Sequence, residues 1–207
     1  MCSIVGSFDK KTLADLIEAN KYRGTSRHSV LAVRYENKNI RTAFRAMGDG
    51  VFEDFDELPN DCYYIAHHQA PTSHDSLFHP AKHGNVSVFH NGIIKNRHIK
   101  VMQEELGSSS HWDTQLIAEA IDKNGYSCLK TIDGSFACVV ITESEVNIFR
   151  NAIAPMFIDD KLSISSTVLP GYATIESEKV WNLDLVLKTR SVVYSFETCD
   201  NVFFFGE

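Results

Sequence analysis

Long hydrophobic runs, paired cysteines and an excess of positive charge are all missing from this chain of 207 residues. No apolar run approaches the roughly 18 residues that a membrane-spanning helix needs, and no signal-peptide pattern opens the chain. The formal net charge is −7, and the Lys and Arg residues are scattered, which argues against a general nucleic-acid-binding surface. These absences predict a protein that binds neither membranes nor nucleic acids.

Cysteine is scarce and widely spaced. The five cysteines contain no C-x-x-C pair and are odd in number; they are Cys2, Cys62, Cys128, Cys138 and Cys199. This pattern fits neither a disulfide framework nor a zinc site, and it indicates a reducing, cytoplasmic location. The histidines between positions 67 and 79 are irregularly spaced and have no matching ligand cluster, so we expect no metal and no cofactor.

No linker, low-complexity tract or internal repeat divides the sequence. Hydrophobic residues make up 43% of it, which is enough for one substantial core. We therefore expect a single domain covering residues 1–207. Short strands with turn signals between them, and helices grouped in two places, predict an α+β fold with layered antiparallel sheets.

Apolar spacing locates the expected elements. Helices are predicted over 11–21, 97–106 and 113–123. Strands are predicted over 2–8, 29–35, 40–47, 62–67, 86–90, 135–141, 146–150, 156–158, 162–165, 192–196 and 202–205. Asn91-Gly92 is a strong hairpin signal, so the strand over 86–90 is expected to enter a turn there. No helix or strand is predicted over residues 176–188, and this region is instead a candidate contact surface for a partner protein.

Cys2 carries the most chemical information, because removal of Met1 would make it the amino terminus. One residue would then hold both a thiol and a free α-amine that titrates at about 7.7–8.0. Such an amine can act as the base for its own nucleophile. The alternative is an ordinary buried Cys at the start of the first strand.

Further motifs follow Cys2 along the chain, and each alone has an ordinary structural explanation. Asn91-Gly92, for example, reads first as a turn, although an Asn amide and a Gly N–H can also form an oxyanion hole. The segments are Tyr22-Arg23-Gly24, Ala66-His67 with Thr72, His79-Pro80, His90-Asn91-Gly92 and Asp113-Thr114. Their order along one chain is more informative than any single motif.

Taken together, these segments resemble the glutaminase domain of the class-II glutamine amidotransferases, such as that of glucosamine-6-phosphate synthase, within the N-terminal-nucleophile hydrolase superfamily. The opening Met-Cys-Ser-Ile-Val-Gly is similar to the family's Met-Cys-Gly-Ile-Val-Gly. Residues 90–96, His-Asn-Gly-Ile-Ile-Lys-Asn, are close to its His-Asn-Gly-Ile-Ile-Glu-Asn. The resemblance extends from Cys2 to about residue 196. It implies a four-layer αββα sandwich of two antiparallel sheets between helical layers.

The resemblance also implies roles for individual residues. Cys2 would attack the side-chain amide of glutamine, and Asn91 and Gly92 would hold the resulting oxyanion. The substrate-binding residues would be Arg23, His67, Gln69, Thr72 and Asp113, with Asp113 on the α-ammonium and Arg23 ordering the entrance near Cys2. The products would be glutamate and ammonia, formed through a γ-glutamyl thioester. A separate synthase would accept the ammonia.

Gln69 is the main departure from the family pattern, since the family has an Arg there that pairs with the α-carboxylate of glutamine. A neutral Gln offers hydrogen bonds but no charge, so Arg27 or His68 would have to compensate. Gln69 therefore favours an alternative, an N-terminal-nucleophile hydrolase of another small amide. A non-catalytic binding protein on the same fold is the third hypothesis. The joint presence of Cys2, Asn91 and Asp113 argues against it.

Overall fold

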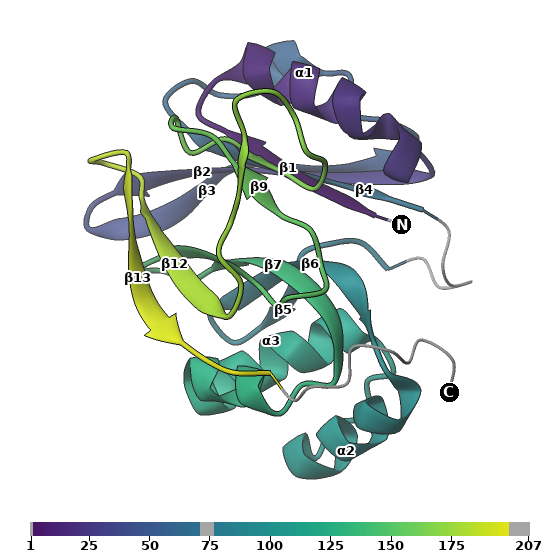
Figure 1. Ribbon diagram of the computed structural model, residues 1–207. Helices are drawn as coiled ribbons and strands as arrows, with labels where there is room; N and C mark the ends of the chain where they lie inside the picture. Colours follow the sequence, from purple (N-terminus) through teal and green to yellow (C-terminus); the bar gives the residue numbers. More distant parts are fainter. Residues whose placement is uncertain (1, 71–76, 199–207) are drawn as a thin grey trace.

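The computed structural model describes residues 2–70 and 77–198. Within these ranges, two antiparallel sheets stack face to face, and helices cover the outer face of each sheet (Figure 1). The four layers confirm the αββα sandwich that the sequence resemblance implied. The strand over 202–205 was also predicted, but it lies outside the described residues.

The first sheet carries the start of the chain at its centre. Its strands follow the order β11 (Ala173–Thr174), β9 (Phe157–Ile158), β10 (Ile164–Ser165), β1 (Ser3–Ser7), β4 (Tyr63–Gln69), β2 (Arg27–Glu36) and β3 (Asn39–Asp49). In the register of β1 and β4, Ser3 lies opposite His68 and Ile4 opposite His67. Continuing this register places Cys2 beside Gln69.

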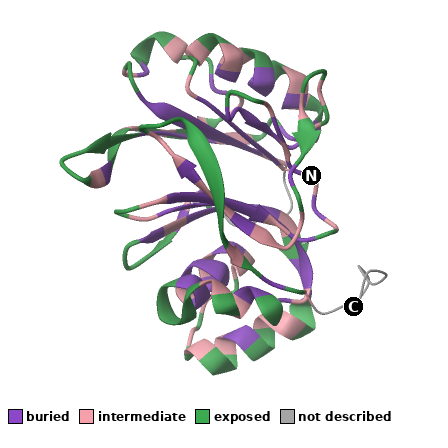
Figure 2. Cartoon of the chain, turned by 60° about the vertical axis from the view of Figure 1, so that its left-hand side comes forward, coloured by how far each residue is buried: buried purple, intermediate pink, exposed green. Residues whose placement is uncertain are grey.

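The second sheet contains the strand that includes Asn91 and Gly92. Its order is β13 (Thr189–Ser195), β12 (Lys179–Asp184), β8 (Val146–Arg150), β7 (Gly134–Ile141), β6 (Val86–Ile94) and β5 (Ala81–His83). All residues of β7 are buried, because the other sheet covers one of its faces and helices cover the other. Figure 2 shows this burial concentrated in the strands between the two helical layers.

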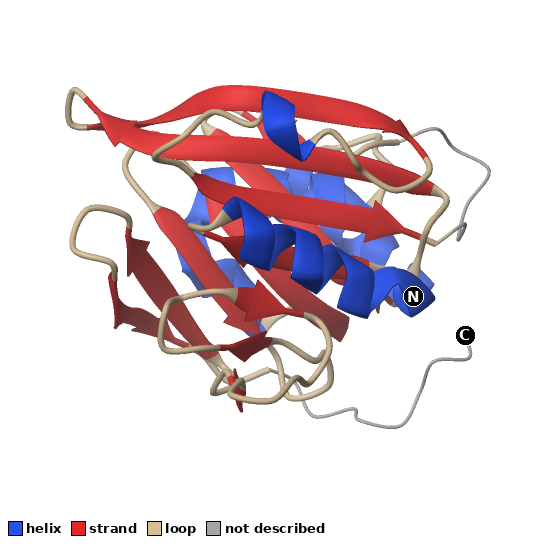
Figure 3. Ribbon diagram, turned by 90° about the horizontal axis from the view of Figure 1, so that it is seen from above, coloured by secondary structure: helices blue, strands red, loops and turns tan. Residues whose placement is uncertain are grey.

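Three helices form the outer layers, namely α1 (Lys10–Asn20), α2 (Asn96–Leu106) and α3 (Asp113–Asn124). The side chain of Asp9 caps α1 by accepting a hydrogen bond from the Thr12 N–H at 2.7 Å. Seen from above, α1 lies over the first sheet (Figure 3). Short 3₁₀ helices occur at η1 (Lys21–Arg23), η2 (Phe55–Glu57) and η3 (Gly125–Lys130). None of the described helices has the length and apolar character needed to cross a membrane.

Each interface between layers has its own apolar core. The largest lies between the two sheets and includes Ile4, Ile65 and Val139. A second core joins α2 and α3 to the outer face of the second sheet, and a third packs Leu13 and Leu16 of α1 on the first sheet. Because the packing fixes both sheets, residues at their ends are held in defined positions.

Two predictions of local structure were wrong. The strand predicted over 86–90 continues through Asn91-Gly92 to Ile94, so this pair is not a turn. Residues 176–188 contain a regular strand, β12, and its hairpin to β13. In both places, pairing with neighbouring strands overrides the local turn signals.

Candidate active site

A cavity of about 510 Å³ lies where the start of β1 faces the end of β6. It draws residues from both sheets and from the start of α3. Six of the eight site residues predicted from the sequence line it: Cys2, Arg23, Gln69, Asn91, Gly92 and Asp113. Thr72 lies outside the described residues, and His67 does not line the cavity. Residues separated by more than a hundred positions in sequence thus share one concave surface.

The backbone around Cys2 is fixed by a close contact between three segments. Gly24 packs so tightly on β4 that a Cβ atom at this position would lie 2.6 Å from the Ala70 nitrogen. Arg23, the residue before it, is buried and donates a hydrogen bond from Nε to the Cys2 carbonyl at 3.0 Å. The Arg-Gly motif therefore has a physical basis: Gly allows the approach, and Arg holds the first strand.

Burial raises the pKa of the Cys2 thiol above its ordinary value. The Asp113 carboxylate acts in the same direction, whereas an N–H from Ala70 and the Arg23 charge favour the thiolate without outweighing burial. The thiol is consequently protonated near neutral pH. A base must take its proton when the sulfur attacks.

Gly92 approaches the neighbouring strand more closely than any side chain would allow. Its φ is +154°, and a Cβ atom there would lie 1.9 Å from the Ser135 carbonyl oxygen and 2.7 Å from His90 Nε2. Gly92 thus serves a strand-to-strand contact rather than a hairpin turn. This contact holds Asn91 and Gly92 at the wall of the cavity.

Ser166 connects β1 to Asn91, a contact that the sequence analysis missed. Its hydroxyl accepts the Ile4 N–H at 2.9 Å and donates to the Ile4 carbonyl at 3.2 Å. It also accepts one N–H of the Asn91 amide at 3.3 Å. The hydroxyl is fully used, and the second N–H of Asn91 remains for another acceptor. No local motif marks Ser166, because its partners come from distant parts of the chain.

Asp113 is anchored at the first turn of α3. Its carboxylate accepts the Thr114 N–H at 2.7 Å and the Ile94 N–H at 3.4 Å, and His90 Nδ1 lies 3.7 Å away. Burial alone would raise the pKa of Asp113, but the His90 charge and these hydrogen bonds outweigh it and lower the pKa. The start of a helix also favours a negative charge. The cavity therefore contains a fixed carboxylate at neutral pH.

Three buried histidines, His67, His79 and His90, lie close together at the cavity, and His79 and His90 line it. The rings of His67 and His79 stack with centroids 3.8 Å apart. The Thr114 hydroxyl lies 3.3 Å from His79 Nε2 and 3.3 Å from His90 Nδ1. Burial and the neighbouring histidines lower the pKa of His67 to about 3, so this ring is neutral. The contact of His67 with substrate stays a prediction; the His67 ring lies in the interior, with 1% of its surface exposed.

Neither of the two residues considered as substitutes for the family Arg supplies a charge to the described cavity wall. Arg27 pairs with Asp49 at 3.7 Å and lies over the Phe78 ring. Burial lowers the pKa of His68 to about 4, and its Nε2 accepts the Phe52 N–H at 3.3 Å. Within residues 2–70 and 77–198, no group of His, Cys, Asp and Glu residues is arranged to hold a metal ion.

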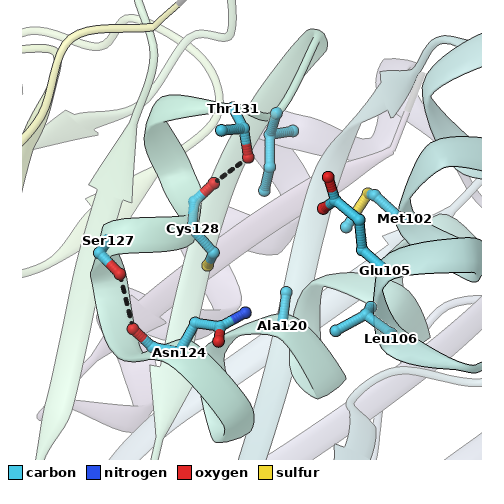
Figure 4. Close-up of a pocket in the computed structure, with 9 residues that line it drawn as sticks. Met102, Glu105, Leu106, Ala120, Asn124, Ser127, Cys128 and Thr131 are labelled. Atoms are coloured by element: carbon cyan, nitrogen blue, oxygen red, sulfur yellow. Dashed lines mark hydrogen bonds between the residues drawn. The ribbon is translucent and has the colours of Figure 1, made fainter.

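A second hollow of about 280 Å³ lies in the outer helical layer, where η3 faces α2 (Figure 4). Cys128 lines it, opposite Met102 and Glu105. Burial raises the pKa of Cys128 to about 12, so this thiol stays protonated and is a poor nucleophile. Cys62 and Cys138 are buried as well. Of the cysteines that the structure describes, Cys2 alone lines the main cavity.

Comparison with known proteins agrees with the motifs. Residues 64–168 match a family model described as a glutamine amidotransferase domain. Over 72% of the chain, the sequence is 28% identical to the glutamine–fructose-6-phosphate aminotransferase (isomerizing) of Sulfurisphaera tokodaii and 31% identical to that of Buchnera aphidicola. The matched parts cover 30% and 28% of those relatives, so the chain spans about a third of their length.

Solved structures support the fold independently of sequence identity. Glutamine phosphoribosylpyrophosphate amidotransferase from B. subtilis superposes with a TM-score of 0.70 at 16% identity, covering 93% of this chain and 48% of that one. A structure described as the allosteric regulatory enzyme of purine biosynthesis gives a TM-score of 0.62 over 89% of this chain and 47% of that one, also at 16% identity. The resemblance inferred from the motifs is thereby confirmed: the chain belongs to the family of class-II glutamine amidotransferase domains.

Proposed function

We propose that this chain hydrolyses the side-chain amide of glutamine to glutamate and ammonia through a γ-glutamyl thioester on Cys2. The observation that carries the proposal is the cavity itself. It brings together a buried thiol, an amide donor beside a glycine, and a fixed carboxylate, drawn from Cys2, Asn91, Gly92 and Asp113. A nucleophile, oxyanion donors and a group for the substrate's ammonium are the parts that amide transfer to water requires.

The first step is attack by the Cys2 sulfur on the amide carbon. The raised pKa of the thiol means that a proton has to leave as the C–S bond forms. The α-amine of Cys2 is the proposed base, and it is available only after Met1 has been removed. The same amine then returns the proton to the departing ammonia. A water molecule finally cleaves the thioester and yields glutamate.

The oxyanion formed in this step needs donors in the cavity wall. Asn91 donates one amide N–H to Ser166 and keeps the other, and Gly92 lies beside it in the cavity wall. One such donor contributes about 3 kcal/mol to transition-state stabilisation in comparable sites. Ser166 would act as a positioning residue, because it ties Asn91 to the backbone of β1.

The fate of the ammonia belongs to the proposal as well. The relatives are named as glutamine–fructose-6-phosphate aminotransferases, which implies an acceptor for the nitrogen of glutamine. We infer that ammonia passes to a separate acceptor-bearing synthase. We also propose that residues 1–207 form a single domain. The proposed location is the cytoplasm, where the Cys2 thiol stays reduced.

Turnover by the processed protein tests this function. Intact-mass measurement first shows whether Met1 is absent, and glutamate release from glutamine is then followed by a coupled glutamate dehydrogenase assay. We expect stoichiometric glutamate and ammonia from protein that lacks Met1. Processed, folded protein that binds glutamine without releasing either product would favour a non-catalytic binding protein.

Replacing Asp113 by Asn should weaken glutamine binding while leaving the chemical step largely intact. A hydrogen bond to a charged group contributes about 1.5–3 kcal/mol, so kcat/KM should fall roughly 10- to 100-fold. The loss should appear in KM, because the ammonium is remote from the reacting carbon. Steady-state kinetics measure both constants. The matched control is Asp122→Asn. Asp122 belongs to the same helix and is exposed, but it does not line the cavity.

The lowered pKa of Asp113 predicts how the difference between the wild-type and Asp113→Asn proteins depends on pH. The pKa of Asp113 is lowered, so its contribution is present above that pKa and is lost only as the pH falls through it. The ratio of wild-type to Asp113→Asn kcat/KM should therefore stay flat between about pH 6 and pH 8. A ratio that changes within this window, or a loss in kcat alone, would contradict the assigned role.

A further inference from the structure

The cavity contains very little positive charge. Apart from the α-amine that removal of Met1 would give Cys2, Arg23 and Asp113 are the two described lining residues that carry a formal charge at neutral pH, counting histidines as neutral. The segments 71–76 and 199–207 contain no Lys or Arg, so they cannot add a permanent cation. Arg23 already donates a hydrogen bond from Nε to the Cys2 carbonyl, and Arg27 forms an ion pair with Asp49. Taking a free carboxylate out of water into such a site is costly.

Gln69 is the polar side chain nearest to Cys2 in the strand register. Ser3 pairs with His68, so Gln69 is the residue beside Cys2 on β4, and both line the cavity. A Gln amide carries two N–H donors and a carbonyl acceptor but no charge. It can donate to the carbonyl and accept from the N–H of a peptide group, and it thereby matches a neutral amide in both directions.

Part of the cavity wall is apolar. Its apolar side chains come from four separate segments: Leu77, Ile93, Ile99, Trp112, Ile153 and Pro155. Ile93 is 59% exposed although it belongs to the mostly buried strand β6, and Leu77 is 36% exposed. Exposed apolar side chains gathered at a cavity are typical of a binding surface. A volume of about 510 Å³ falls in the range of sites for ligands larger than a single amino acid.

We propose that the preferred substrate is a glutamine whose α-carboxylate is already in amide linkage, as at the amino end of a peptide with an apolar second residue. The inference rests on the proposed function and uses the same nucleophile. Asp113 would hold the free α-ammonium, Gln69 the following peptide group, and the apolar wall the second side chain.

The reaction remains an amide hydrolysis and balances without a further reagent. The Cys2 sulfur forms a bond to Cδ, the side-chain amide carbon, as the C–N bond breaks and ammonia leaves. Water then breaks the thioester, with a C–O bond forming and the proton returning to sulfur. The product is a peptide that begins with glutamate.

Three substrates separate this proposal from the general one: free glutamine, L-glutaminamide, and glutaminyl-leucine amide. Conversion by processed protein is followed by mass spectrometry, which distinguishes a glutamyl peptide from the pyroglutamyl peptide of spontaneous cyclisation. The Cys2→Ala protein supplies the background. We expect kcat/KM for glutaminyl-leucine amide to exceed that for glutamine at least tenfold, with glutaminamide between them.

A charge substitution tests the same idea in the opposite direction. Gln69→Arg should raise kcat/KM for free glutamine and lower it for glutaminyl-leucine amide, shifting their ratio at least tenfold. Asn96→Arg places the same charge at an exposed position on the cavity rim, and it should shift the ratio less than threefold. Thermal unfolding verifies that both proteins are folded.

The possible failures are distinguishable. If free glutamine is the best substrate of the unmodified enzyme, this inference is overturned while the proposed function stands. If none of the three compounds is hydrolysed by folded protein that lacks Met1, the proposed function fails as well. A Gln69→Arg protein with an unchanged ratio would also overturn the assignment of Gln69, whatever the absolute rates.

Discussion

The Cys2→Ala protein is expected to lose glutamine hydrolysis by a factor of about 10⁴ or more. The substitution removes the only nucleophile that the proposed mechanism uses, and the α-amine that remains cannot form the thioester. The first strand should keep its place, because Arg23 binds the carbonyl of Cys2 rather than its sulfur. Glutamate release and thermal unfolding, measured on the same preparation, separate lost chemistry from lost structure.

Covalent labelling identifies the reactive sulfur directly. The glutamine analogue 6-diazo-5-oxo-norleucine should react in the cavity, where the sulfur displaces dinitrogen and forms a C–S bond. Peptide mass spectrometry should locate the label on Cys2. Cys62, Cys128 and Cys138 are internal controls, because none of them lines the cavity. A label on one of them with Cys2 unmodified would refute the assignment of the nucleophile.

A second variant separates the nucleophile from its base. Inserting a Glu residue between Met1 and Cys2 keeps the thiol but converts its amine into an amide. Since the thiol is protonated near neutral pH, turnover should fall almost as far as in Cys2→Ala. In the uninserted protein, the rate should rise with pH through about 7.7–8.0, the titration range of a free α-amine. Full activity in the inserted protein would rule out the α-amine as the base.

The sequence predicted the layers of this fold well because both faces of its sheets are covered. Strands such as β7 are apolar over most of their length, here from Phe136 to Ile141, and helices such as α1 show a regular apolar face. These patterns are local, so they are visible without the structure. Weak strands such as β12 were missed because pairing with β8 and β13 defines them more than their own composition does.

The candidate site was predictable where a motif reflects local chemistry. Cys2 and Asp113 stand at the starts of elements, and both line the cavity. Ser166 could not be predicted, because its hydrogen bonds reach Ile4, 162 positions away. His67 was assigned to the substrate because it belongs to a matched motif, but its side chain is buried and does not line the cavity.

Asn91-Gly92 shows most clearly how one dipeptide can have two physical explanations. In a turn, glycine allows a positive φ. Here the absence of a side chain at Gly92 also allows β6 and β7 to approach each other closely. The two explanations predict different results for an alanine substitution: the added methyl group would meet open space in the first case and a neighbouring strand in the second. A pair of alanine substitutions can therefore test which of them applies to this protein.

Replacing Gly92 by Ala should destabilise the protein by about 3 kcal/mol or more. The new Cβ would lie 1.9 Å from the Ser135 carbonyl, so β6 and β7 must separate or shift. A residue with a side chain also strains a backbone held at φ +154°. Because a displacement of about 1 Å at an oxyanion site can cost 10²-fold in rate, glutamine turnover should fall at least that far in protein that still folds.

Gly107→Ala is the matched control for this prediction. Gly107 also has a positive φ, +68°, but a Cβ atom there would meet nothing within 4 Å. It should therefore cost only about 1 kcal/mol of backbone strain and leave kcat unchanged. Urea denaturation gives the two free energies of unfolding, and steady-state kinetics give the two rates. Equal losses in both proteins would mean that positive φ alone matters at Gly92. A much larger loss in Gly92→Ala would mean that the contact with Ser135 holds Asn91 and Gly92 in place at the cavity wall.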